Sequence, residues 1–199
     1  MKLFLTSVAS KTLDKIVPLL PKPPKELKVA FIPTAGDTYK EKPWMEEDRE
    51  KLVDLGFNVA DFDLKGKTES QIEKALSKVD IIFVAGGNTF YLLEKTKQSG
   101  FDKVVKKLVK NGTIYVGSSA GSILAGPNIE PVKILDDPQK ARLDSFEGLG
   151  LVDFVILPHY GKEKYKIDKI IKEYGNKYQL IPITDDQLVV AEDDRFYKL

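Results

Sequence analysis

Residues 113–126 constrain the fold of this chain more than any other stretch, because they combine the signals of a strand, a sharp turn and a helix. Thr-Ile-Tyr-Val is typical of a strand, residues 117–121 fit the pattern G-x-S-x-G, and small apolar residues follow. In that context the pattern predicts that Ser119 occupies the turn with its hydroxyl exposed. The next backbone N–H, that of Ala120, is then free to bind an oxyanion. Glycine and serine also form ordinary turns, so other residues must decide whether this turn carries a nucleophile.

Strand and helix patterns alternate along the chain. Predicted strands cover residues 2–7, 29–33, 57–64 and 80–85, and predicted helices cover residues 12–20, 44–55, 69–76, 90–98 and 101–110. After the G-x-S-x-G turn we expect a long loop (128–148), a strand (151–157), a helix (162–174) and three strands of a closing sheet edge (179–183, 188–191 and 195–199). The alternation predicts an α/β fold, a three-layer α/β/α sandwich with a largely parallel sheet and ligand chemistry at the carboxyl ends of its strands.

Composition narrows the class of protein. With 199 residues the chain is long enough for one good core, and we expect a single domain over residues 1–199. Its 31 basic and 30 acidic residues nearly cancel, which disfavours nucleic acid and an anionic membrane as partners. The absence of cysteine excludes thiolate catalysis and cysteine metal sites. No apolar run suits a signal peptide or a membrane span. We therefore expect a cytoplasmic protein without metal or cofactor, acting on a small ligand.

His159 is the only histidine in the chain, and it directly follows the predicted strand 151–157. A nucleophilic serine needs a base that titrates near neutrality, and histidine supplies one without a large pKa shift. Because both residues follow strands, Ser119 and His159 should emerge at the same edge of the sheet. The alternative is a structural histidine in a surface turn, but the position of His159 directly after a strand favours a role as the base.

A carboxylate must orient the imidazole of such a base. Asp185 and Asp186 lie in the turn after the predicted strand 179–183, and Asp185 is our first candidate. A plain hairpin turn also favours aspartate. The second candidate is Asp136 in the long loop, with Asp137 behind it.

The turn Gly86-Gly87-Asn88-Thr89 follows a buried strand and completes the set. Its glycines let the backbone approach a substrate closely, and the Gly87 N–H can complete an oxyanion hole with Ala120. Substrate contacts are expected from Gly86, Asn88 and Thr89. Nucleotide binding is disfavoured, because the turn lacks both the third glycine of G-x-G-x-x-G and the lysine of a P-loop.

These motifs, with Gly-Leu-Gly-Leu at 148–151 and Pro-His-Tyr at 158–160, resemble the peptidase E (aspartyl dipeptidase) family of serine peptidases, whose relatives include the cyanophycinases. The resemblance covers nearly the whole chain. It implies a fold similar to class I glutamine amidotransferases (flavodoxin-like), with Ser119 as nucleophile, His159 as base, and Gly87 and Ala120 as oxyanion donors. Family members place the acid, often Glu, where this chain has Asp185. An older family assignment corresponds to Asp136.

The resemblance implies a cytoplasmic serine exopeptidase that hydrolyses short peptides, including those with N-terminal aspartate, as a monomer or homodimer. A substrate aspartate requires a cation, for which Lys133, Arg142 and Lys162 are candidates. Alternatives are an isoaspartyl or β-aspartyl bond hydrolase on the same triad, and a binding homologue without turnover.

Overall fold

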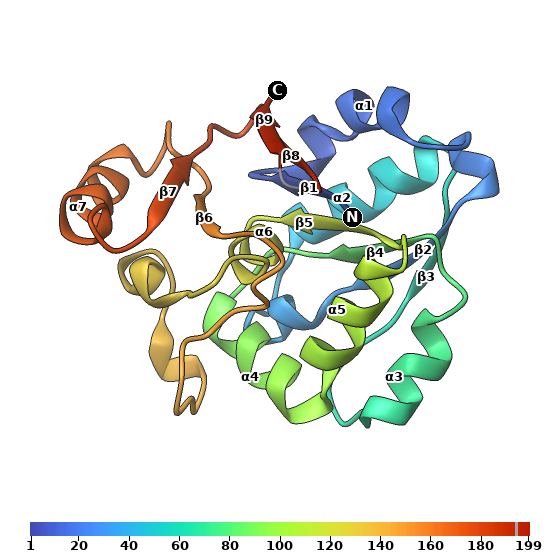
Figure 1. Ribbon diagram of the computed structural model, residues 1–199, viewed down its shortest axis with the longest axis horizontal. Coiled ribbons are helices and arrows are strands. Elements are labelled where there is room, and N and C mark those ends of the chain that lie inside the picture. Colours follow the sequence, from blue (N-terminus) through green and yellow to red (C-terminus); the bar gives the residue numbers. More distant parts are fainter. Residues whose placement is uncertain (194) are drawn as a thin grey trace.

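The computed structural model describes residues 1–193 and 195–199, and a seven-stranded sheet forms its centre (Figure 1). Neighbouring strands follow the order β3-β2-β4-β5-β1-β8-β9. Their bounds are β1 (Lys2–Thr6), β2 (Lys28–Ile32), β3 (Asn58–Asp61), β4 (Ile81–Val84), β5 (Ile114–Ser118), β8 (Leu188–Glu192) and β9 (Arg195–Lys198). β1 to β5 pair in parallel, whereas β8 and β9 are antiparallel to their neighbours. The expected largely parallel sheet is therefore confirmed.

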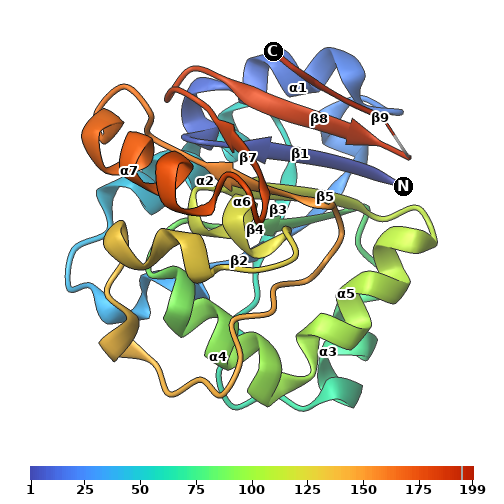
Figure 2. The same cartoon turned by 60° about the vertical axis from the view of Figure 1, so that its left-hand side comes forward.

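Helices cover both faces of this sheet (Figures 1 and 2). The α-helices are α1 (Leu13–Ile16), α2 (Pro43–Asp54), α3 (Glu69–Leu76), α4 (Thr89–Ser99), α5 (Phe101–Lys110), α6 (Ala120–Leu124) and α7 (Lys164–Tyr174). The 3₁₀ helices are η1 (Ala9–Lys11), η2 (Val17–Leu19), η3 (Pro24–Glu26), η4 (Thr34–Thr38), η5 (Glu130–Ile134) and η6 (Pro138–Lys140). A capping box precedes α3, because Thr68 and Gln71 exchange hydrogen bonds.

The inner strands of the sheet bury both of their faces, which explains their nearly continuous apolar sequences; these strands are β1, β2, β4, β5 and β8. In β1, Leu3 and Leu5 join the core under α3, α4 and α5, and Phe4 joins the core under α1 and α2. All three side chains are fully buried. The two cores on opposite faces of one sheet make up the expected three-layer α/β/α sandwich.

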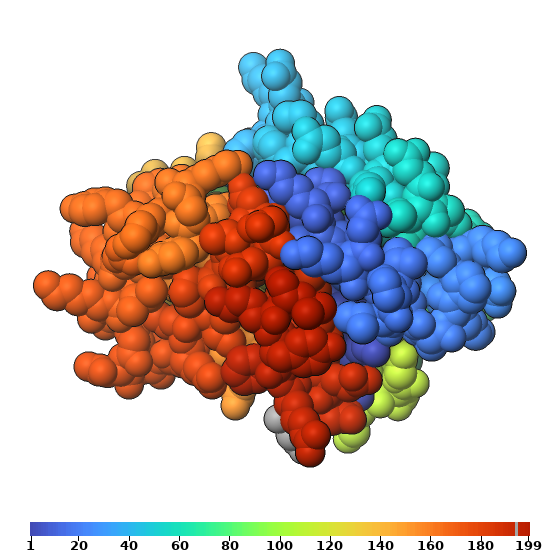
Figure 3. All heavy atoms as spheres, turned by 90° about the horizontal axis from the view of Figure 1, so that it is seen from above, coloured from blue at the N-terminus to red at the C-terminus, as the bar shows by residue number. Residues whose placement is uncertain are grey.

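One edge of the sheet collects the ends of several strands. Because β1, β4 and β5 run parallel, residues that follow them emerge at the same edge. β8 runs the other way, and Thr6 pairs with Leu188 at its start, so the turn before β8 reaches this edge as well. The pairing brings the two ends of the chain together, and Figure 3 shows blue N-terminal and red C-terminal surfaces in contact.

The structure corrects two expectations. β7 (Gln179–Pro182) is not part of the main sheet edge, since it pairs in parallel with β6 (Phe154–Leu157) in a separate two-stranded sheet beside α7 (Figure 1). The helix expected at residues 12–20 is α-helical only in α1 and then tightens into η2, because Pro18 offers no N–H for an α-helical bond. Among the described residues, no helix is long and apolar enough to cross a membrane.

Candidate active site

The turn between β5 and α6 holds Ser119 in a strained backbone conformation, with φ of 48° and ψ of −105°. Positive φ is unfavourable for a residue with a side chain and persists only where the surroundings enforce it. The flanking glycines make the turn possible. A Cβ on Gly117 would lie 2.6 Å from the Gly121 carbonyl carbon, and one on Gly121 would lie 2.1 Å from the Val84 carbonyl oxygen. Only glycine lets α6 begin so close to β4 and β5.

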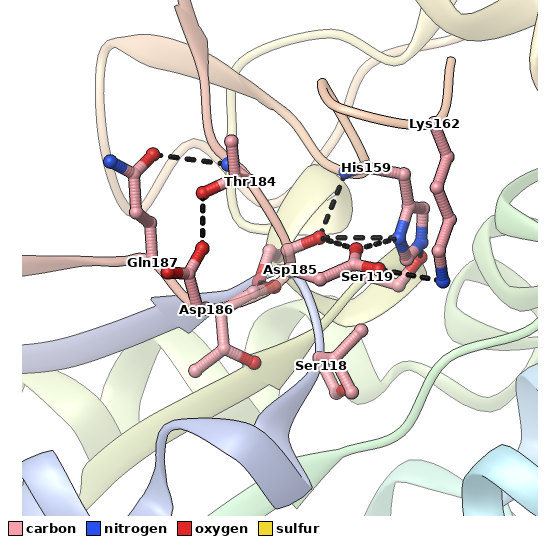
Figure 4. A network of polar contacts seen from close by, with 12 residues as sticks. Ser118, Ser119, His159, Lys162, Thr184, Asp185, Asp186 and Gln187 are labelled. Carbon is pink, nitrogen blue, oxygen red and sulfur yellow. Dashed lines mark hydrogen bonds and ion pairs between the residues drawn. The ribbon is translucent and has the colours of Figure 1, made fainter.

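His159 follows β6 and Pro158, and it also has a positive φ of 62°. Its Nε2 lies 3.0 Å from the Ser119 Oγ. On the other side of the ring, Nδ1 lies 2.7 Å from the Asp185 Oδ1 (Figure 4). If Nδ1 carries the proton and donates it to Asp185, Nε2 is left as an acceptor for the serine hydroxyl. The structure thus connects three residues from distant parts of the chain in one hydrogen-bonded row.

Asp185 is anchored at both oxygens. Its Oδ1 accepts hydrogen bonds from His159 and from the Ser7 hydroxyl at 3.0 Å, and its Oδ2 lies 2.7 Å from the Lys162 ammonium. Burial pushes the pKa of this carboxyl up, but the hydrogen bonds from Lys162, His159 and Ser7 outweigh it and lower the pKa to about 2. Asp185 is therefore ionised at any pH near neutrality. Asp186 instead hydrogen-bonds Thr184 within its own turn (Figure 4).

Ser7 is a site residue that the sequence analysis missed. It follows β1, and its Oγ accepts a hydrogen bond of 2.8 Å from the backbone N–H of His159 while it donates to Asp185. One hydroxyl therefore positions both the base and its carboxylate. The available signal was weak, because Ser7 shares only a strand end with the other site residues.

The glycine turn after β4 lies against Ser119. A Cβ on Gly86 would be 3.3 Å from the Ser119 Cβ, and one on Gly87, where φ is 148°, would be 2.2 Å from the Ala35 carbonyl oxygen. In the described part of the chain, the Gly87 N–H has no acceptor. Ala120 is the first residue of α6, so its N–H has no acceptor within that helix. Both amides expected to act as oxyanion donors are thus available.

Asn88 and Thr89 are buried, and their side chains are engaged within the protein. Asn88 caps α4 by accepting the Tyr91 N–H at 2.9 Å and donates to the Asp137 carbonyl oxygen at 3.0 Å. Thr89 donates to Asp136 from both its N–H, at 2.9 Å, and its hydroxyl. Their contacts fix the start of α4 and the loop above it, and neither residue lines the cavity at Ser119.

A cavity of about 520 Å³ opens over Ser119 and His159. Gly86 and Gly87 line it, as do Tyr39, Trp44, Asp48, Asp136 and Lys162. Asp136 lies in this cavity but forms no hydrogen bond with His159, whose Nδ1 is bonded to Asp185. The structure therefore brings Asp185, and not Asp136, to the imidazole.

The match to a known family is decisive. A model of peptidase family S51 matches residues 3–199. The chain belongs to peptidase family S51. It is accordingly a peptidase, and the serine type fits this family. The sequence resemblance to peptidase E is confirmed by relatives and by a solved structure of that name.

Relatives in family S51 cover the whole chain or its larger part. An uncharacterized peptidase of Listeria monocytogenes serovar 1/2a, Lmo0363, is 36% identical over 193 residues, which are 94% of this chain and 92% of the relative. Peptidase E of Salmonella typhi is 35% identical over 130 residues, 65% of this chain and 54% of that protein. The chain thus matches about half the length of this peptidase E.

Solved structures share the fold. A crystal structure of a candidate peptidase E protein from Listeria monocytogenes EGD-e superposes with a TM-score of 0.93 at 32% identity, covering 100% of this chain and 97% of that one. A peptidase from an acI-B1 Actinobacterium has a TM-score of 0.70 at 18% identity, covering 100% and 86% of the two chains. The second likeness concerns the fold alone.

The three cations considered for a substrate carboxylate lie in different places in this S51 peptidase. Lys162 lines the cavity, but its ammonium is paired with Asp185. Lys133 pairs with Glu130 and lies over the Phe146 ring, and the Arg142 backbone bonds Glu94; neither residue lines the cavity. Lys162 is therefore the one of the three that reaches the site.

Proposed function

We propose that this S51 peptidase hydrolyses short peptides through a Ser119–His159–Asp185 triad and an acyl-enzyme. The single observation that carries the proposal is the unbroken row of contacts, 3.0 Å from Ser119 Oγ to His159 Nε2 and 2.7 Å from Nδ1 to Asp185. A nucleophile and a base within hydrogen-bond reach, with the base oriented by a carboxylate, have the geometry that nucleophilic catalysis requires.

In the acylation step, the Ser119 Oγ attacks the carbonyl carbon of the scissile bond while His159 Nε2 takes the hydroxyl proton. The ionised Asp185 stabilises the imidazolium that forms, and its low pKa keeps it charged throughout. The tetrahedral intermediate then collapses: the C–N bond breaks, and His159 gives its proton to the leaving amine. An ester between Ser119 and the acyl half of the peptide remains.

The oxyanion of the intermediate is assigned to the backbone N–H groups of Gly87 and Ala120. Fixed amides aimed at a developing negative charge need no reorganisation during the reaction, and one such donor contributes about 3 kcal/mol in other serine peptidases. Gly86 supports this arrangement, because a side chain there would crowd Ser119.

In the deacylation step, a water molecule attacks the ester carbonyl and His159 Nε2 takes its proton. The acyl carbon–oxygen bond to Ser119 breaks, His159 returns the proton to the serine, and the acid product leaves. Water is the only reactant that this step consumes.

For the substrate, we propose short peptides cleaved near the free N-terminus, including those that begin with aspartate. Support comes from the peptidase E relatives, and from Lys162, an exposed cation at the cavity whose pairing with Asp185 leaves its other N–H groups for a substrate carboxylate. The match covers 54% of peptidase E of Salmonella typhi, so the substrate of that relative comes to this chain only as a proposal.

The first test compares hydrolysis of Asp-, Ala- and Leu-p-nitroanilide by the wild type and by Ser119→Ala. We expect kcat/KM on every cleaved compound to fall at least about a thousandfold in the variant, because the nucleophile is lost and only binding and the oxyanion hole remain. Ser122→Ala is the matched control, since the hydroxyl of Ser122 is buried on backbone carbonyls and touches neither His159 nor the cavity. Undiminished activity of Ser119→Ala would end the proposed mechanism.

A further inference from the structure

Asp136 lines the cavity, and its carboxylate has no role in the proposed mechanism. The residue follows η5, where its backbone N–H bonds the Val132 carbonyl oxygen at 3.0 Å, and its side chain reaches the first turn of α4. There the Oδ2 accepts hydrogen bonds from the Thr89 N–H, at 2.9 Å, and from the Thr89 hydroxyl. Two bonds to one oxygen fix the orientation of the whole carboxylate.

The other oxygen of Asp136, Oδ1, is in a different situation. Among the described residues, nothing hydrogen-bonds Oδ1, and no lysine or arginine pairs with the carboxylate. Asp185 differs, since each of its oxygens is bonded and a lysine neutralises it. A half-buried carboxylate without a cation has lost part of its solvation, and a cationic ligand can compensate for that loss. Asp136 therefore presents a half-satisfied negative charge to the cavity.

Asp136 lies close to the reacting groups without being part of the row that they form. It lines the same cavity as Ser119 and His159. Burial raises the pKa of Asp136, whereas hydrogen bonds from Thr89 and the nearby imidazole of His159 lower it, so the imidazole is within electrostatic reach. Because Asp185 occupies the imidazole Nδ1, Asp136 is placed to meet a substrate and not to orient the base.

The neighbours of Asp136 suit a cation. Tyr39 lies near enough that burial and then the charges of Asp136 and Asp137 raise its pKa. Its ring packs edge-on against Trp44 with centroids 5.2 Å apart, and both rings line the cavity. A carboxylate oxygen beside aromatic rings matches the charge-assisted hydrogen bonds and cation–π contacts that ammonium groups form.

We propose that Asp136 binds a primary ammonium group of the peptide substrate. The inference rests on the proposed function, because it takes Ser119 as the point of attack. Two parts of a peptide carry this group, the free N-terminus and a lysine side chain. An exopeptidase meets the first in every substrate, and an ammonium held at Asp136 would fix how far the cleaved bond lies from the end of the peptide.

The experiment measures binding without hydrolysis. Ser119→Ala protein, with and without Asp136→Asn, is titrated calorimetrically with three peptides: Ala-Ala-amide, acetyl-Ala-Ala-amide and acetyl-Lys-Ala-amide. We expect a peptide with an ammonium to bind roughly tenfold or more tightly than acetyl-Ala-Ala-amide, and Asp136→Asn to remove that advantage, because a charged hydrogen bond is lost. Preference for Ala-Ala-amide identifies the N-terminus as the source, and preference for acetyl-Lys-Ala-amide identifies the side chain.

Asp48→Asn is the matched control. Asp48 lines the same cavity, but it is 1% exposed and bonds the Ser10 N–H at 2.7 Å and Ser118, so we expect no change in the preference for an ammonium. Equal binding of all three peptides to Ser119→Ala protein that keeps Asp136 would overturn the proposal. So would a preference that survives Asp136→Asn in protein whose thermal unfolding is normal. Because hydrolysis plays no part, a wild type without peptidase activity would contradict the proposed function separately.

Discussion

At the scale of single residues, three aspartates have surroundings that give them different properties: Asp48 and Asp136, which line the cavity, and Asp185, which bonds the imidazole of His159. Asp185 is held ionised by Lys162, His159 and Ser7 against the effect of burial. One oxygen of Asp136 accepts two hydrogen bonds, and the other accepts none from the residues that the structure describes. Asp48 is buried between a backbone N–H and a hydroxyl, and burial raises its pKa to about 6 in spite of these bonds. The same side chain thus supports three roles: orienting a base, meeting a ligand, and joining α2 to the end of β5.

The pKa of Asp48 predicts how its removal changes stability with pH. The folded state binds the proton of the Asp48 carboxyl more tightly than the unfolded state, whose pKa is 3.8. Proton binding therefore stabilises the fold fully below about pH 4, and this stabilisation is lost as the pH rises through about 6. Asparagine does not titrate, so we expect the free energy of unfolding of Asp48→Asn, relative to that of the wild type, to increase by up to about 3 kcal/mol from pH 4 to pH 7.5. Urea denaturation at both pH values measures it. A difference that does not vary with pH would contradict the assigned burial of the charge.

At the scale of elements, α6 and β5 determine where the nucleophile sits. The helix starts directly after Ser119, and Gly121 lies so close to β4 that a Cβ there would overlap the Val84 carbonyl oxygen. β1 closes the turn from the other side, because the Thr6 carbonyl oxygen accepts the Ser119 N–H at 3.0 Å. The strained backbone of Ser119 is therefore fixed by packing on two neighbouring strands.

Gly121→Ala tests this packing. We expect a loss of several kcal/mol in the free energy of unfolding, because the added methyl group can be accommodated only by moving α6 away from β4. Gly161→Ala is the control, since a Cβ there meets nothing within 4 Å. Chemical denaturation of both variants gives the comparison, and equal stability of the two would refute the close approach of helix and strand.

Sequence patterns predicted these elements unequally well. The G-x-S-x-G turn was predictable because each of its glycines has a local steric cause. The inner strands of the main sheet were predictable because both of their faces are buried. The pairing of the strands was less predictable. Residues 179–183 have the pattern of a strand, but nothing in that pattern says that β7 pairs with β6 and not with the main sheet.

At the scale of the whole molecule, the candidate site is assembled from strand ends that are far apart in sequence. Ser7 and Ser119 follow β1 and β5, which are paired in parallel, and Asp185 precedes β8, which is antiparallel to β1. His159 arrives from the smaller sheet and meets all three. Sequence analysis could bring Ser119 and His159 to one place by their positions after strands. It preferred Asp185 and kept Asp136 as the second candidate, because the choice depends on which carboxylate reaches Nδ1, and the sequence does not contain that distance.

The most direct test of the central claim is to treat the protein with a fluorophosphonate and to map the modified residue by mass spectrometry. A serine activated by His159 forms one covalent adduct, and we predict that it is found on Ser119, is absent from Ser119→Ala, and forms far more slowly in His159→Asn. Ser118 and Ser122 flank this position and provide an internal control. An adduct on either of them, or labelling of Ser119 that is equally fast without His159, would contradict the account.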